Sequence, residues 1–172
     1  MSTRALLRAL AVALALLTVN GVAAPAANAT GTPTAKLTMA GDVELLPGLD
    51  FFHVDMHARQ PAGGPTTGSF AGAGELRGTG FTIPVPLSLA GPVTCLTVHG
   101  ATAAFLYPVA EVNPPLLRGL LQGTTSVLFT VTKGANGAPD LVGFVGPLPS
   151  QLFRGCQPTG TPFVFHGTVR IA

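Results

Sequence analysis

The chain has 172 residues, of which nine are Lys or Arg, seven are Asp or Glu, two are Cys and none is Trp. Only 9% of its residues are charged, whereas 22 are Gly and 16 are Pro. This composition excludes the basic stripe with which proteins bind nucleic acid, and it favours short β-strands joined by turns over helices.

Residues 1–29 have the pattern of a secretory signal peptide. Two arginines precede an uncharged apolar run at residues 9–19, and the small-x-small motif at residues 27–29 suits a signal peptidase. A membrane-spanning helix needs about 20 apolar residues, so this run is too short for an anchor. We therefore expect a mature chain, residues 30–172, that is secreted or cell-wall associated and has no membrane span; the alternative is an N-terminal core helix.

Cleavage would change the charge balance and the chemistry expected of the cysteines. Two of the nine basic residues precede the cleavage point, which leaves seven basic and seven acidic residues and a formal net charge of zero. No polybasic patch for an anionic membrane remains. Because export exposes Cys95 and Cys156 to an oxidising compartment, we predict a disulfide between them. Two free thiols or half of a metal site are the alternatives.

From residue 35 onward, apolar and polar residues alternate and turn signals recur about every 8–12 residues, as in sandwiches and barrels. The expected strands are residues 36–39 continued by 42–45, then 50–58, 69–77, 81–89, 92–99, 101–109, 125–132, 141–145 and 162–171. Gly72 and Gly74 predict a bulge or a close backbone approach, and two prolines make residues 81–89 an edge strand or an extended rim segment. Strand 101–109 is apolar on both faces, so we expect it to be central and covered on both sides.

One short helix is expected at residues 114–121. Asn113 is a favoured N-cap residue, and Pro114 suits the first helical position. Four leucines between residues 116 and 121 form one apolar stripe. A helix of about two turns is marginal alone, so we expect it to pack over a barrel end or a sheet edge. The alternative is a lid that touches a membrane or gates a ligand.

These patterns predict an all-β protein, a single antiparallel β-barrel or closed sandwich of eight or nine strands with one short helix. The interior of an eight-stranded barrel is either filled by side chains or holds one small ligand. An immunoglobulin-like sandwich is the second choice, because about 60 residues separate the two cysteines. However, no Trp lies between them and the first Cys comes late in the chain.

One predicted strand carries candidate metal ligands, His53, Asp55 and His57. Alternate residues of a strand share a face and lie about 6.7 Å apart, so Asp55 could act with either histidine. The two histidines, about 13 Å apart, cannot bind one ion directly, and His99 and His166 are the only other histidines. We favour a solvated strand face over a metal site, and we expect no cofactor.

The sequence contains no motif for a catalytic nucleophile, a zinc protease or a phosphate-binding loop. We therefore assign no catalytic residue and favour a secreted, non-catalytic module that binds a ligand or the cell envelope. Its partner would be a small apolar ligand or an envelope component. The alternative is a secreted enzyme or metal-binding protein that uses the histidine and aspartate strand face.

Residues 91–100, Gly-Pro-Val-Thr-Cys-Leu-Thr-Val-His-Gly, resemble a recurrent segment of small secreted proteins from high-GC Gram-positive bacteria. In that family, a V-T-C-L-x-V-x-G-N-x-A hairpin precedes an Asn/Asp-Gly turn and a second Cys before the final strand. The positions that match are residues 93–100, Ala103, residues 136–137 and Cys156. Ala101 stands where the family has Asn, and residues 114–123 are an insertion. The resemblance implies a compact secreted bacterial β-domain and implies no activity.

Overall fold

The computed structural model describes residues 34–172, so the predicted signal peptide lies outside the described residues. In chain order the strands are β1 (Ala35–Leu46), β2 (Leu49–Gln60), β3 (Thr67–Gly78), β4 (Phe81–Pro92), β5 (Cys95–His99), β6 (Thr102–Pro108), β7 (Glu111–Asn113), β8 (Thr125–Thr132), β9 (Asp140–Pro149) and β10 (Phe163–Ile171). The helical segments are the 3-10 turn η1 (Pro115–Leu117), the short helix α2 (Arg118–Leu121) and the 3-10 turn η2 (Ser150–Leu152). The predicted all-β class with one short α-helix is confirmed. None of the helices in this part of the chain is long and apolar enough to cross a bilayer.

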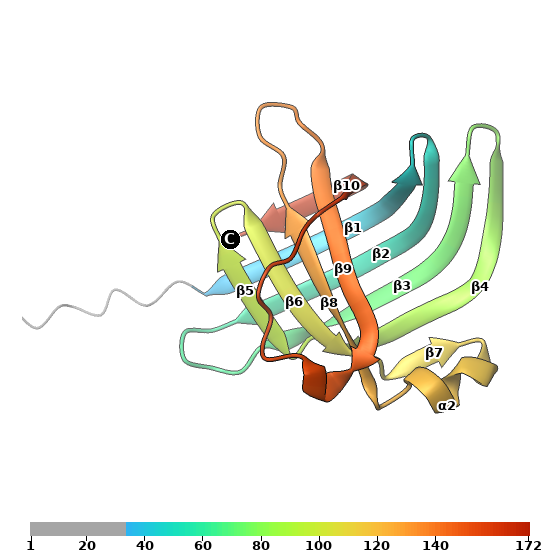
Figure 1. Ribbon diagram of the computed structural model, residues 1–172. Helices are drawn as coiled ribbons and strands as arrows, with labels where there is room; N and C mark the ends of the chain where they lie inside the picture. Colours follow the sequence, from blue (N-terminus) through green and yellow to red (C-terminus); the bar gives the residue numbers. More distant parts are fainter. Residues whose placement is uncertain (1–33) are drawn as a thin grey trace, which may run out of the picture. The chain divides into compact units, whose positions relative to one another are not determined.

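All ten strands belong to one antiparallel sheet with the order β5-β6-β8-β9-β10-β1-β2-β3-β4-β7. The long hairpins β1–β2 and β3–β4 form a curved wall, and β5, β6, β8 and β9 cross over its concave side (Figure 1). Across this interior, β5 contacts β1 and β2, and β6 contacts β4. The sheet is a half-barrel, since its edge strands β5 and β7 do not pair with each other.

The strand beyond the expected eight or nine is β7, which ends at Asn113, the residue that the sequence pattern assigned to the N-cap of the helix. Its residues are extended and pair with Ser88–Ala90 of β4. The helix consequently begins later than predicted, and Asn113 belongs to β7 and caps nothing. The predicted N-cap is therefore wrong, because pairing with β4 holds Asn113 in the strand.

The leucines around α2 do not form the single stripe that was predicted. Leu117 and Leu121 pack against the core, whereas Leu116 and Leu120 are 76% and 70% exposed. Residues four apart share one side of a helical segment, so the four leucines divide into two pairs on different sides. The predicted packing over a sheet edge is confirmed, because α2 contacts the edge strand β7.

Two strand predictions are confirmed and one is corrected. Strand β6 lies between β5 and β8 with Phe105 fully buried, as its apolar faces predicted. The proline-containing half of β4 pairs with β3 alone, since β7 reaches only Ser88–Ala90, and it is therefore an edge. Strand β9 is longer than predicted and includes Pro147, which stands with Gly146 opposite Val127 in a bulge. A bulge leaves one residue of the strand unpaired in any case, so proline at that position removes no hydrogen bond from the ladder.

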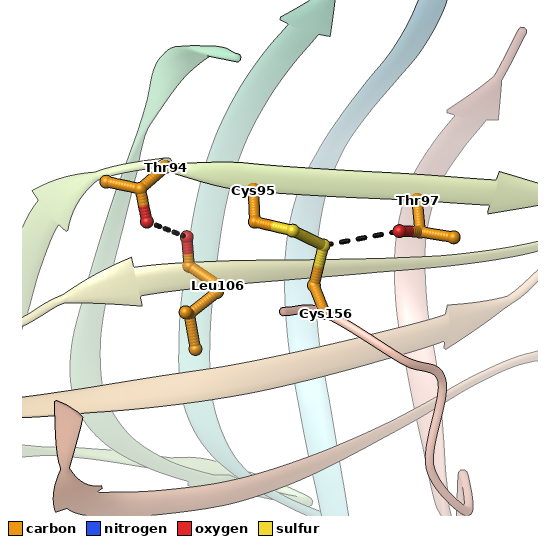
Figure 2. The surroundings of a disulfide bond; sticks show 5 residues. All are labelled: Thr94, Cys95, Thr97, Leu106 and Cys156. Carbon is orange, nitrogen blue, oxygen red and sulfur yellow. Dashed lines mark hydrogen bonds between the residues drawn. A yellow bond between two sulfur atoms is a disulfide. The ribbon is translucent and has the colours of Figure 1, made fainter. Parts of the chain in front are cut away.

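The predicted disulfide between Cys95 and Cys156 is present, with 5.9 Å between the Cα atoms (Figure 2). Cys95 lies on β5, and Cys156 lies in the long link between η2 and β10. Cys156 is buried against Ala104 and Leu128 on the convex side of the sheet. The link therefore covers β6 and β8 from outside, while the wall covers them from inside.

The core lies on the concave side, where alternate residues of the long strands point inward. Four aromatic rings occupy its centre: Phe70 and Tyr107 stack with 4.0 Å between ring centroids, and Phe105 and Phe129 with 5.4 Å. We call the part of the concave side around Phe70 and Phe105 the closed end. Both of these side chains are at most 1% exposed.

Candidate functional site

The concave side contains a pocket beside the closed end, with a cavity volume of about 170 Å³. It lies between residues of β1, β2 and β4 on one side and residues of β6, β8 and β9 on the other. Its aromatic lining residues are Phe51, Phe52, Tyr107, Phe129 and Phe144, and aliphatic residues, one Gly and one Pro complete the lining. None of the lining residues is charged. Apolar cavities of about 150 Å³ remain dry and bind molecules as large as benzene.

Two glycines of β3 make room for neighbouring side chains, and one of these, Phe52, lines the pocket. A Cβ atom at Gly72 would lie 2.2 Å from Cε1 of Phe52, so the Phe52 ring rests where a side chain of β3 would otherwise stand. A Cβ at Gly74 would lie 2.9 Å from Cβ of Val85. The pairing of β3 with β4 shifts register just after Ala73, which confirms the predicted bulge. The glycines thus let neighbouring side chains cover β3 closely.

A second irregularity brings Phe51 to the pocket. Strict alternation along β2 would place Phe51 on the convex side with His53, opposite Phe52. The pairing of β2 with β3 shifts between Asp50 and Phe52, and such a bulge changes the direction of the side chains beside it. Phe51 and Phe52 both line the pocket as a result, with 6.4 Å between their ring centroids.

The apolar face continues beyond the pocket toward the tips of the long hairpins. Leu45 and Phe144, which line the pocket, are 42% and 46% exposed, and Leu46, Phe81 and Ile83 are also exposed. We call this region, together with the pocket, the open end. Burying a large apolar side chain is worth about 1.5–3 kcal/mol, so covering the exposed apolar side chains beside the pocket with another apolar group would be favourable.

Tyr107 is the lining residue with a polar side-chain atom. Its side chain is only 1% exposed, and burial raises the pKa of Tyr107 well above its ordinary value, so the hydroxyl keeps its proton. Within residues 34–172, every fully buried side-chain nitrogen or oxygen has a hydrogen-bond partner, and the Tyr107 hydroxyl makes no hydrogen bond to another residue of this range. The hydroxyl must therefore border accessible space, and the pocket is the space that Tyr107 lines.

The candidate metal ligands His53, Asp55 and His57 all lie exposed on the convex side of β2. His53 Nδ1 lies 2.8 Å from Asp42 Oδ1, and His57 Nδ1 lies 3.3 Å from Ser69 Oγ. Each histidine thus has a polar partner on a neighbouring strand. No three His, Cys, Asp or Glu side chains between residues 34 and 172 are placed to hold one metal ion.

Polar contacts on the convex side hold the strands of the open end together. Arg77 of β3 donates to Asp42 of β1 at 2.8 Å, and Glu44 of β1 lies 3.0 Å from the ring of His166 on β10. The backbone N–H of Gly48 also donates to Glu44. Chiefly this backbone hydrogen bond, and then the one with His166, hold the pKa of Glu44 below its ordinary value of 4.5.

Sequence reasoning identified none of the pocket residues. One signal was present: residues 78–110 contain no Asp, Glu, Lys or Arg, although they include the exposed half of β4. An uncharged strand that is not fully buried points to an apolar contact on its open side. The lining residues on β9 beyond residue 145 had no comparable signal, because the sequence pattern ended that strand at residue 145.

The geometry therefore defines a class, an all-β half-barrel with an apolar pocket at one end of its concave side. No family model, curated protein or solved structure matches this chain. The resemblance of residues 93–100 to small secreted bacterial proteins stays a prediction.

Proposed function

We propose that this protein is a secreted, non-catalytic binding module that holds a small apolar molecule in the half-barrel pocket. The observation that carries this proposal is the continuity between an uncharged pocket of about 170 Å³ and the exposed apolar side chains at its mouth. Small-molecule sites are typically concave and apolar with few polar groups. A ligand that fills the pocket and covers Leu45 and Phe144 removes their exposed apolar surface from water, and this burial favours binding.

Secretion is part of the proposal. The disulfide supports it, because such bonds persist in oxidising compartments and are rare in the cytosol. The signal-peptide pattern of residues 1–29 supports it independently. Expression of the full chain in a secreting bacterial host should release protein into the medium. Its N-terminal sequence should begin at Thr30, and its intact mass should be that of residues 30–172. Full-length protein retained in the cells would contradict the secretion part.

A catalytic role has less support at this site. General acid–base and nucleophilic catalysis require titratable or activated groups within hydrogen-bond reach of the reacting atoms. The pocket lining provides one phenol and no acid, amine, imidazole or thiol. The titratable groups of the open end, Asp42, Glu44 and Arg77 among them, belong to the convex side, where they contact one another or His166.

Binding can be tested with a neutral fluorophore, N-phenyl-1-naphthylamine, titrated into the disulfide-bonded mature protein. We expect its fluorescence to rise to saturation at one molecule per chain. Phe144→Asp should weaken binding at least tenfold, because it places a carboxylate at the mouth of an apolar pocket. Phe81→Asp is the matched control: Phe81 is 44% exposed against 46% for Phe144, but it does not line the pocket.

Circular dichroism should show that both variants fold, since both positions are half exposed. Absence of saturable binding by the wild-type protein would overturn the proposal. Equal weakening by the two substitutions would also overturn it, because the fluorophore would then bind the exposed apolar surface and not the pocket.

A further inference from the structure

We propose that the Tyr107 hydroxyl selects the ligand, which is an uncharged molecule with an apolar body and a hydrogen-bond-accepting oxygen such as a ketone or ester carbonyl. This inference rests on the proposed function and specifies the chemistry of the same pocket. It is carried by one hydroxyl, that of the lining residue Tyr107, which has no hydrogen-bond partner among residues 34–172 and stands among apolar lining residues.

The Tyr107 ring is held in place before any ligand arrives. It stacks on Phe70 with an interplanar angle of 19°, and its centroid lies 6.3 Å from that of Phe105. On the adjoining side the chain comes so close that a Cβ at Gly91 would lie 3.3 Å from Cδ2 of Tyr107. A donor fixed in this way loses little conformational freedom when it binds, which favours affinity and selectivity.

A buried tyrosine hydroxyl normally has a hydrogen-bond partner, because leaving it unpaired forfeits the interactions that it makes with water. No group of residues 34–172 supplies that partner for Tyr107. A ligand oxygen in the pocket would supply it. A pocket with a hydrogen-bonding group also discriminates against analogues that lack the matching group, because the protein group is then left unpaired.

The charge of the ligand follows from the rest of the lining. No Lys, Arg or His lines the pocket, so a carboxylate or phosphate would lose its hydration without gaining a cationic partner. The one cation described at the open end, Arg77, already binds Asp42 and Glu75 on the convex side. The pocket therefore favours a neutral oxygen acceptor over an anionic headgroup.

The test compares three probes of equal chain length, which displace the fluorophore from the pocket. 2-Nonanone carries a carbonyl, 2-methyl-1-nonene replaces that oxygen by a methylene group, and nonanoate carries a charge. We expect the wild-type protein to bind the ketone about three- to tenfold more tightly than the alkene, the range expected for one net hydrogen bond. Nonanoate should bind more weakly than the ketone.

Tyr107→Phe keeps the ring and removes the hydroxyl, so it should abolish the preference for the ketone and leave alkene affinity unchanged. The wild-type protein provides a second readout that needs no variant. Tyr107 is the only tyrosine and the chain has no Trp, so near-ultraviolet absorption reports this residue directly. The ketone should shift the tyrosine band to longer wavelength, as hydrogen-bond donation by a phenol does, and the alkene should not.

The failures are distinguishable. If neither the fluorophore nor any probe binds the wild-type protein, the proposed function itself is wrong. If ketone and alkene bind equally and only equal spectral changes occur, the pocket binds apolar molecules and the role of Tyr107 is overturned. Tighter binding of nonanoate than of the ketone would overturn the assignment of an uncharged ligand.

Discussion

The closed and open ends of the concave side contain similar apolar residues, but different forces hold them. At the closed end, the rings of Phe70 and Phe105 pack against each other and against Phe129, and the disulfide-bonded link covers β6 and β8 from the other side. At the open end, the apolar side chains border a cavity and water, and polar contacts on the convex side join the strands. The comparison shows how one sheet can keep its stability at one end and leave an apolar surface exposed at the other.

The largest expected effect comes from removing an aromatic ring at the closed end. Phe105→Ala should lower the free energy of unfolding by about 3–5 kcal/mol, because it leaves a cavity in a fully packed core. Phe51→Ala, at the open end, should lower it by about 1 kcal/mol, because the Phe51 ring is only partly buried beside an existing cavity. Urea denaturation of both variants measures the difference.

Phe51→Ala should nevertheless weaken fluorophore binding, which would separate the two ends by function as well as by stability. Equal losses of stability in Phe105→Ala and Phe51→Ala would break the comparison, since the open end would then contribute to the core as much as the closed end does.

The closed end was largely predictable from the sequence, for a physical reason. Its strands alternate regularly, so a period of two identifies inward residues such as Phe105 and Val131 without knowledge of the fold. The disulfide followed from two cysteines in a chain expected to be exported. The apolar residues on both faces of β6 predicted that it would be covered on both sides, although the sequence did not reveal that the link carrying Cys156 supplies the outer cover.

The open end was not predictable, because its geometry depends on departures from that alternation. A bulge turns Phe51 inward beside Phe52, and another admits Pro147 to β9, where the sequence pattern ended the strand at residue 145. Whether an inward side chain is buried also depends on which strands cross above it. Where strands cross depends on the curvature of the whole sheet, which the sequence pattern does not give. Val43 is buried, for example, whereas Leu45, two residues later on the same face, is 42% exposed.

Loss of the disulfide should free the link that covers the closed end from outside. Cys95→Ala combined with Cys156→Ala should lower the free energy of unfolding by about 2–4 kcal/mol, because the disulfide restricts the unfolded chain across a sequence separation of 61 residues. Thermal denaturation with and without reductant measures the effect. Reductant should destabilise the wild-type protein and leave the double variant unchanged. If reductant lowers the stability of both, the effect does not come from this bond and the link does not secure the closed end.

The smallest expected effect concerns the polar contacts that hold the open end. Because the folded protein lowers the pKa of Glu44, its ionised carboxylate stabilises the fold at pH values above the ordinary 4.5, and this contribution disappears as the pH falls through the lowered pKa. Glu44→Gln keeps the side chain's shape and removes the charge. Its melting temperature should therefore be slightly below that of the wild-type protein at pH 7 and equal to it in acid. The difference at pH 7 should be smaller than the one that either change at the closed end produces.

The Glu44→Gln variant should also speed hydrogen exchange at the Gly48 amide, which donates to Glu44, and leave exchange in β6 and β8 unaffected. Faster exchange in those two strands would mean that the convex contacts of the open end also hold the closed end, and the two ends would then unfold as one unit.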